Sequence, residues 1–180
     1  LSLVRVVSLH SNWKILDLGT GAGFPGIPLK IFFPELNMTL MDSLNKRVLF
    51  LREVIETLGL KNIEALHGRA EEMARKKEFR EQFDLCVSRA VANIATLSEY
   101  CLPFVRLGGK FISYKSGQIG EEMLNGKKAV FLLGGKITEI DQFHVPCTEL
   151  DRCLVVIDKI KGTPKTYPRK AGTPSKDPLK

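Results

Sequence analysis

The segment from Lys14 to Pro28 constrains the fold of this chain more than any other. A short apolar run leads into Asp17, and glycines then follow at positions 19, 21, 23 and 26. Glycine tolerates a positive φ and lets a ligand lie against the backbone, because it has no Cβ. Pro25 and Pro28 suit the first turn of a helix. The segment therefore predicts a buried strand, a tight turn and a helix N-terminus, which form the nucleotide-binding corner of an α/β sheet.

Two kinds of cofactor fit such a turn. Gly21, Gly23 and Gly26 have the spacing of dinucleotide-binding proteins, although this pattern alone is weakly specific. Asp17 followed by Gly19 has instead the acidic residue and glycines of enzymes that use S-adenosylmethionine (SAM). A carboxylate at the strand tip would repel a pyrophosphate but suits the ammonium and sulfonium groups of SAM. We therefore predict a SAM site at Asp17, Gly19, Gly21 and Gly23, with a dinucleotide site or a turn without ligand as alternatives.

A second acidic residue, Asp42, follows the next apolar segment, residues 37–41. A carboxylate at the tip of a second strand can accept hydrogen bonds from both hydroxyls of a ribose. Asp is also a good N-cap for the helix that we expect to begin near Leu44. We predict that Asp42 binds the cofactor, and the capping role is compatible with this.

The order of the expected elements predicts an α/β fold. The expected strands are 14–18, 37–42, 63–67, 83–88, 109–114, 135–141 and 151–159, and the expected helices are 24–33, 44–58, 69–80, 91–105 and 118–132. Alternating strands and helices favour a parallel sheet. The last two strands are too close in sequence for a parallel crossover, so they should form an antiparallel hairpin. This pattern is typical of a class I SAM-dependent methyltransferase, a Rossmann-like sheet of seven mostly parallel strands.

The composition bounds the remaining possibilities. The chain has 180 residues and is 44% hydrophobic and 26% charged, as expected for one globular domain. It lacks the run of about 18 apolar residues that a membrane span needs, so we expect no membrane association. The four cysteines form no Cys-x-x-Cys pair and the three histidines have no metal-ligand spacing. We therefore expect no metal site and a location in the reducing cytoplasm.

The positive charge is concentrated at the C-terminus. The formal net charge is +7, and residues 159–180 hold seven Lys and Arg against Asp177 alone, which leaves only +1 for residues 1–158. Four prolines interrupt this segment, so we expect an extended basic arm beyond a catalytic domain of residues 1–158. Such an arm attracts polyphosphates, although a merely solvated terminus and an arm that folds back to brace the cofactor pocket are the alternatives. The predicted RNA-binding residues are Lys165, Arg169 and Lys170.

Several short motifs occur together in a distinctive order. They are Asp17-Leu-Gly-Thr-Gly-Ala-Gly-Phe-Pro-Gly-Ile-Pro28, Asp42-Ser-Leu-Asn-Lys-Arg47, His67-Gly-Arg-Ala-Glu71, Ser88-Arg-Ala90 and Tyr167-Pro-Arg-Lys-Ala-Gly-Thr-Pro174. This set closely resembles the bacterial small-subunit rRNA guanine-N7 methyltransferases, called RsmG or GidB, from about residue 14 to the end. That family has additional N-terminal helices, which we expect to be missing from this sequence.

The resemblance implies a cytoplasmic, monomeric enzyme that transfers a methyl group from SAM to N7 of a guanine in 16S rRNA. Its substrate would be the rRNA or a small-subunit particle. The cofactor contacts that the resemblance implies are Gly19, Phe24, Ala70, Glu71 and Arg89. The alternatives are a SAM-dependent methyltransferase with another RNA site or substrate, and an RNA-binding module without catalysis.

The turn after the expected fourth strand is informative about the chemistry. Amino-group methyltransferases have an Asp/Asn-Pro-Pro-aromatic turn there, whereas this chain has Ser88-Arg89-Ala90-Val91. Guanine N7 has a free lone pair, so its methylation needs no general base, and catalysis would consist of positioning. We expect no acid–base residue, and Arg89 is the candidate for positioning substrate and methyl donor.

Overall fold

The computed structural model describes residues 1–89, 92–117 and 120–179. The strands in this part of the chain are β1 (Lys14–Leu18), β2 (Asn37–Asp42), β3 (Ile63–His67), β4 (Phe83–Ser88), β5 (Val105–Ser116), β6 (Gly135–His144) and β7 (Asp151–Lys159). The helices are α1 (Gly26–Phe32), α2 (Asn45–Thr57), α3 (Ala70–Met73), α4 (Ile94–Cys101), α5 (Gly120–Leu132) and α6 (Thr173–Lys176).

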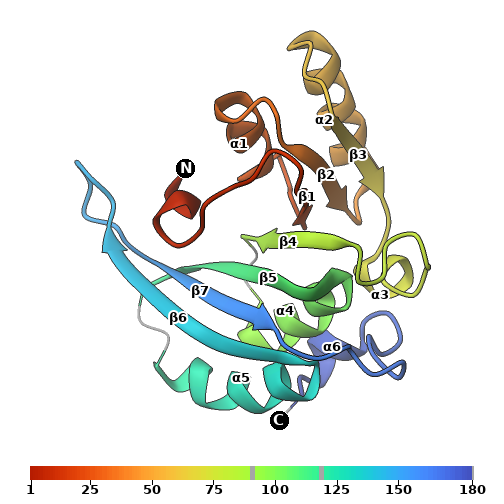
Figure 1. The fold of residues 1–180 in the computed structure, drawn as a ribbon, viewed down its shortest axis with the longest axis vertical. Coiled ribbons are helices and arrows are strands. Elements are labelled where there is room, and N and C mark those ends of the chain that lie inside the picture. The colour runs from red at the N-terminus through yellow and green to blue at the C-terminus, as the bar shows by residue number, and fades with distance from the viewer. Residues whose placement is uncertain (90–91, 118–119, 180) are drawn as a thin grey trace.

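The strands form one sheet in the order β3-β2-β1-β4-β5-β7-β6 (Figure 1). β1 to β5 pair in parallel. β7 runs antiparallel to β5 and to β6, which confirms the predicted terminal hairpin. The predicted α/β sheet of seven mostly parallel strands is therefore confirmed. Because β1 to β4 are parallel, their carboxyl ends meet at one edge of the sheet, where ligands bind in such folds.

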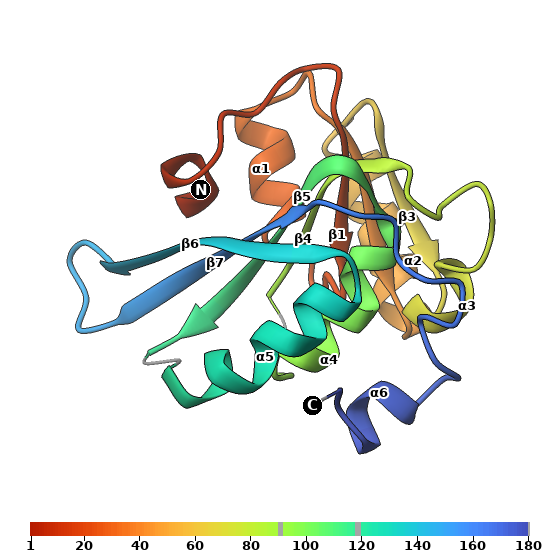
Figure 2. The ribbon, with the colours of Figure 1, turned by 60° about the horizontal axis from the view of Figure 1, so that its bottom comes forward.

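Helices cover both faces of the sheet, with α4 and α5 on one side and α1 on the other (Figure 2). Successive strand residues point to opposite faces, so each strand contributes to two apolar layers. Ile15 packs in the layer that includes α1 and α2, whereas its neighbour Leu16 packs in the layer that includes α4 and α5. Burial on both faces explains why central strands such as β1 are mostly apolar.

α3 and α4 are much shorter than predicted, for local physical reasons. α3 has four residues instead of the predicted 69–80, because the run from Arg75 to Glu78 is fully charged and has no apolar face to bury. α4 begins after Asn93, whose side chain accepts a hydrogen bond from Thr96 N, and gives way to a 3₁₀ turn that contains Pro103. The predicted starts of α4 at residue 91 and of α5 at residue 118 lie outside the described residues.

The C-terminal segment differs from the expected extended arm. Residues 160–179, here called the C-terminal strap, fold back along α3 and α4, and α6 packs against α4 (Figure 2). Arg80 donates hydrogen bonds to the carbonyl oxygens of Thr163 (2.8 Å) and Tyr167 (3.0 Å). Thr163 N in turn donates to Glu81 Oε1 at 2.7 Å. Carbonyl groups that water would otherwise solvate thus find partners in the loop between α3 and β4.

We expect Gly23→Ala to destabilise the fold more than alanine at a comparable glycine. A Cβ at residue 23 would lie 2.5 Å from Cγ1 of Ile27 and 2.9 Å from Cδ2 of Leu51, so α1 would have to shift. Overpacking and the positive φ together should lower the free energy of unfolding by about 3 kcal/mol. Gly59 also has a positive φ but open space around it, so Gly59→Ala should lose about 1 kcal/mol. Equal losses in urea denaturation would contradict this packing role.

Candidate cofactor-binding site

The carboxylate of Asp17 organises the turn between β1 and α1. Its Oδ2 accepts hydrogen bonds from Thr20 Oγ1 at 2.7 Å and from Gly26 N at 2.8 Å. The side chain is completely buried. Gly26 is the first residue of α1, so one oxygen atom joins the strand tip, the glycine turn and the start of the helix.

The environment of Asp17 is suited to a polar ligand. Burial raises the pKa of Asp17 to about 6, although the hydrogen bonds from Thr20 and Gly26 and the charge of Arg89 act in the opposite direction. Its second oxygen, Oδ1, is buried and has no hydrogen-bond partner within the described part of the chain. A buried carboxylate oxygen without a donor is unfavourable, and a cationic group or a bound water would satisfy it.

The glycines of the turn have two different roles. Gly19 and Gly21 have φ values of +69° and +62°, and no heavy atom lies within 4 Å of the position that a Cβ would take. They leave the open space that a ligand against the backbone requires. Gly23, which we also predicted to bind the cofactor, is buried against Ile27 and Leu51 and does not line the cleft described below. The structure therefore gives Gly23 a packing role.

Asp42 lies at the tip of β2, next to Asp17 on β1. Its Oδ2 accepts from Gly21 N (2.9 Å), and its Oδ1 accepts from Leu44 N (2.9 Å). The second bond spans two residues and forms an Asx-type turn that leads into α2, in place of the expected N-cap. Arg47 lies 3.4 Å from the same carboxylate. The side chain is only 3% exposed, yet it lines the cleft, and a carboxylate can accept more hydrogen bonds than these.

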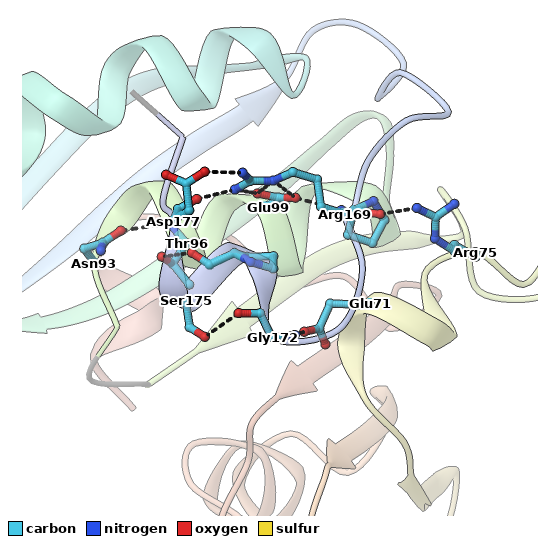
Figure 3. Close-up of polar contacts among 11 residues, drawn as sticks. Glu71, Arg75, Asn93, Thr96, Glu99, Arg169, Gly172, Ser175 and Asp177 are labelled. Carbon is cyan, nitrogen blue, oxygen red and sulfur yellow. Dashed lines mark hydrogen bonds and ion pairs between the residues drawn. The ribbon is translucent and has the colours of Figure 1, made fainter.

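A cleft of about 280 Å³ lies at the carboxyl ends of β1 to β4. Four of the predicted cofactor residues line it, namely Gly19, Asp42, Ala70 and Glu71. The opposite wall comes from α4 and the C-terminal strap, through Tyr100, Gly172 and Ser175. Gly172 N donates a hydrogen bond to Glu71 Oε1 at 2.8 Å, which joins the two walls (Figure 3). This arrangement agrees with the alternative of an arm that folds back onto the cofactor pocket, although no periodicity or spacing in the sequence connects residue 172 with residue 71.

This cleft is not lined by the other predicted cofactor residues, which are Asp17, Gly21, Gly23, Phe24 and Arg89. The guanidinium carbon of Arg89 is 5.3 Å from the centre of the Phe24 ring, within the range of a cation–π interaction. Both side chains line a larger cavity of about 870 Å³, together with residues of β5 and β7 that include Tyr114. The consecutive residues Ser88 and Arg89 line the cleft and the larger cavity respectively, so the two hollows adjoin at the tip of β4.

The predicted RNA-binding residues differ in their surroundings. Lys165 and Lys170 are exposed on the strap. Arg169 instead forms an ion pair with the buried Glu99, with 2.7 Å between Nη2 and Oε2, and a second one with Asp177 at 3.5 Å. Arg169 is therefore a correction to the expected arm of free cations, because a carboxylate 70 residues earlier neutralises it.

None of the helices in the described ranges combines the length and apolar character of a membrane crossing. The described residues also contain no group of three or more His, Cys, Asp or Glu side chains arranged to hold a metal ion.

The fold is shared with known methyltransferases. A putative methyltransferase from Bacillus halodurans aligns with a TM-score of 0.65 at 15% identity, over 89% of this chain and 98% of that chain. TYW2 from P. horikoshii, in complex with MeSAdo, aligns with a TM-score of 0.67 at 11% identity, over 87% of this chain and 59% of that chain. These alignments identify the fold as that of class I SAM-dependent methyltransferases, and the acidic strand tips and the open glycine turn are compatible with it.

The sequence comparisons identify the family. The chain is 57% identical over 179 residues to "Ribosomal RNA small subunit methyltransferase G" of Lachnoclostridium phytofermentans, covering 99% of this chain and 74% of that protein. It is 60% identical over 167 residues to the protein of the same name from Clostridium tetani, covering 93% and 70%. The profile of the GidB family, described as rRNA small subunit methyltransferase G, matches residues 1–151. The chain belongs to this family, which confirms the resemblance seen in the motifs.

The residues present fit SAM, the cofactor of this class. Gly19 and Gly21 leave room against the backbone, and Asp42 offers carboxylate oxygens at the cleft. The unsatisfied Oδ1 of Asp17 suits a cationic group or a water that contacts one. The half-buried Ala70 leaves space beside the third strand for a flat ring. The predicted SAM site is therefore supported by the chemistry of these groups as well as by the family.

We expect Asp17→Asn to stabilise the protein without ligand and to weaken SAM binding. The amide oxygen can still accept from Thr20 and Gly26, while the buried charge disappears. The wild-type pKa is raised from 3.8 to about 6, so its folded state binds more protons between these values. The free energy of unfolding of the wild type should thus carry no penalty from Asp17 below pH 3.8. It should fall as the pH rises from 3.8 through about 6. The variant should gain up to about 3 kcal/mol at pH 7.5 but little at pH 3.5.

Urea denaturation at the two pH values, combined with calorimetric titration of SAM, checks this prediction. SAM affinity should fall at least tenfold in Asp17→Asn, because a cationic ligand loses a carboxylate. Identical pH dependence of stability in the two proteins would show that Asp17 is not a buried charge, and unchanged affinity would remove it from the cofactor site.

Proposed function

We propose that this protein transfers a methyl group from SAM to N7 of a guanine in 16S rRNA, as a monomer in the cytoplasm. Its substrate is the rRNA itself or a small-subunit particle. The observation that carries the proposal is the cofactor cleft that adjoins a larger cavity at Arg89, in a chain that belongs to the rRNA small subunit methyltransferase G family. The cleft of about 280 Å³ lies just below the range of about 300–1,000 Å³ that is typical of small-molecule sites, and the larger cavity of about 870 Å³ lies within it.

The residues around the larger cavity support methylation of an atom that carries no proton. When bound, SAM supplies an electrophilic methyl group on its sulfonium. Guanine N7 has a lone pair, so the protein needs no side chain to remove a proton. The carboxylate in this cavity, Glu122, already accepts from Lys115 Nζ (2.5 Å) and Ile94 N (2.6 Å), which leaves it poorly suited as a general base.

Positioning is then the main contribution of the protein to catalysis. Asp42 would hold the ribose hydroxyls, and Ala70 and Glu71 would border the adenine. Phe24 and Arg89 are exposed at the junction of the two hollows, where an aromatic ring and a guanidinium can stack on a base or contact its phosphate. Holding base and methyl donor in line supplies a large part of the rate enhancement in reactions of this kind.

Mapping of the modified nucleoside tests the proposal. The protein is incubated with labelled SAM and either 16S rRNA or small-subunit particles from cells that lack this gene. The RNA is then digested and analysed by mass spectrometry. We expect 7-methylguanosine at one position. Label on another atom, another base or another RNA would favour the alternative of a SAM-dependent methyltransferase with a different substrate.

We expect the exposed lysines of the strap to contribute to RNA binding. Replacing Lys165 and Lys170 together by Ala should raise the KM for RNA several-fold and reduce the salt dependence of binding by about one to two units of slope. The KM for SAM should stay unchanged. Lys61→Ala is the matched control, because Lys61 is equally exposed but precedes β3, at the opposite edge of the sheet from the cleft. Equal effects of the control and the double variant would refute a specific role of the strap lysines.

A further inference from the structure

The ion pair between Arg169 and Glu99 holds the C-terminal strap on α4. Arg169 Nε donates to both carboxylate oxygens of Glu99, at 3.0 and 3.1 Å, and Nη2 donates to Oε2 at 2.7 Å. The backbone N of Arg169 adds a fourth hydrogen bond, to Oε1 at 2.8 Å (Figure 3). The Glu99 side chain is completely buried. A buried carboxylate is strongly destabilising without a partner, so Glu99 requires Arg169 in this position.

Further hydrogen bonds continue from this ion pair toward the cofactor cleft. Thr96 lies three residues before Glu99, on the same face of α4, and its Oγ1 donates to Pro174 O at 2.9 Å. Arg169 Nη2 also donates to Asp177 O at 2.7 Å, which closes the segment into a loop. Gly172 lies within this loop and donates to Glu71 Oε1. Figure 3 shows these contacts as one connected group between α4, α3 and the strap.

The same loop forms part of the cleft. Gly172 and Ser175 line it directly, and so does Glu71, whose side chain is only 7% exposed. These strap residues have their positions because residue 169 is fixed on one side and Pro174 on the other. Without the ion pair, the wall that faces the tips of β1 to β3 would keep only the Thr96–Pro174 hydrogen bond and the packing of α6 as attachments to α4.

We propose that the C-terminal strap is a wall of the cofactor cleft and that Arg169 is a positioning residue for cofactor binding. The inference rests on the proposed function only in that it takes this cleft as the SAM site. Arg169 acts through Glu99 and the loop that contains Gly172, and it does not touch the reacting atoms. This role replaces the RNA contact that the basic composition of the segment predicted for it.

The neighbouring residue provides an internal comparison. Lys170 is exposed and forms no side-chain hydrogen bond within the described residues, whereas Arg169 is 23% exposed and paired with two carboxylates. Two adjacent cations of one motif thus have separate functions. Arg169 should affect the cofactor and Lys170 should affect the RNA.

Coupling between strap and cofactor must be reciprocal. If the attached strap favours ligand binding, the ligand must favour the attached strap to the same extent. S-adenosylhomocysteine (SAH), the demethylated product, should therefore slow tryptic cleavage after Lys170 and Lys176. This readout needs neither RNA nor turnover.

The test compares Arg169→Leu, Arg169→Lys and Lys170→Leu in the complete chain. Titration calorimetry gives the Kd for SAH, and initial rates give the KM values for SAM and RNA. We expect Arg169→Leu to raise the Kd for SAH at least tenfold, with the KM for RNA within about twofold of wild type. Arg169→Lys should be intermediate, since it keeps the charge but loses the two-pronged geometry. Lys170→Leu should show the opposite pattern, with a raised KM for RNA and an unchanged Kd for SAH.

A second variant covers the case in which Arg169→Leu does not fold. Thr96→Val keeps the shape of the side chain and removes only its hydrogen bond to Pro174 O, so it should weaken SAH about threefold and speed tryptic cleavage of the strap. Variants that lose thermal stability but keep the wild-type Kd for SAH would overturn the inference and leave the proposed function intact. Failure of the wild type itself to bind SAH would instead overturn the assignment of the cleft.

Discussion

The buried carboxylate of Asp17 is the interaction on which the cofactor site depends. One of its oxygens accepts hydrogen bonds from the hydroxyl of Thr20 in the turn and from the first backbone N–H of α1. The strand, the turn and the helix are therefore joined at one atom. This arrangement keeps the backbone at Gly19 and Gly21 open to a ligand. It also keeps a charged group in an apolar sheet, which is unfavourable in the protein alone and becomes favourable when a cationic ligand binds nearby.

The second half of the site comes from a distant part of the sequence. The tips of the parallel strands supply an acidic edge, and the C-terminal strap supplies the facing wall through Gly172 and Ser175. Glu99 and Glu71 connect the two, because each accepts hydrogen bonds from strap residues. Part of the basic charge of the C-terminus therefore has a structural function. The exposed lysines remain available for RNA, and they lie on the same strap that borders the cofactor.

Local patterns predicted the fold well and the site in part. Five strands were predicted to the residue, because four of them, β1, β2, β4 and β7, are short runs of mostly buried apolar residues with clear ends. The motif residues Asp42, Ala70 and Glu71 do meet at one cleft, since parallel strands end at one edge. The extended arm was the wrong choice and folding back onto the cofactor pocket was the alternative, because the composition shows the charges and prolines of this segment but not a buried partner such as Glu99. The glycine pattern likewise could not separate Gly21, which leaves open space, from Gly23, which packs under α1.

A crystal structure of the complete chain with SAH tests the central claim most directly. The account predicts the nucleoside between Asp42 and the Ala70–Glu71 turn, with the strap attached and Gly172 still bonded to Glu71. The methionine portion should extend along Gly19 and Gly21 toward Phe24 and Arg89. A nucleoside bound instead in the larger cavity beside Tyr114, or a ligand bound with the strap detached from α4, would contradict the account.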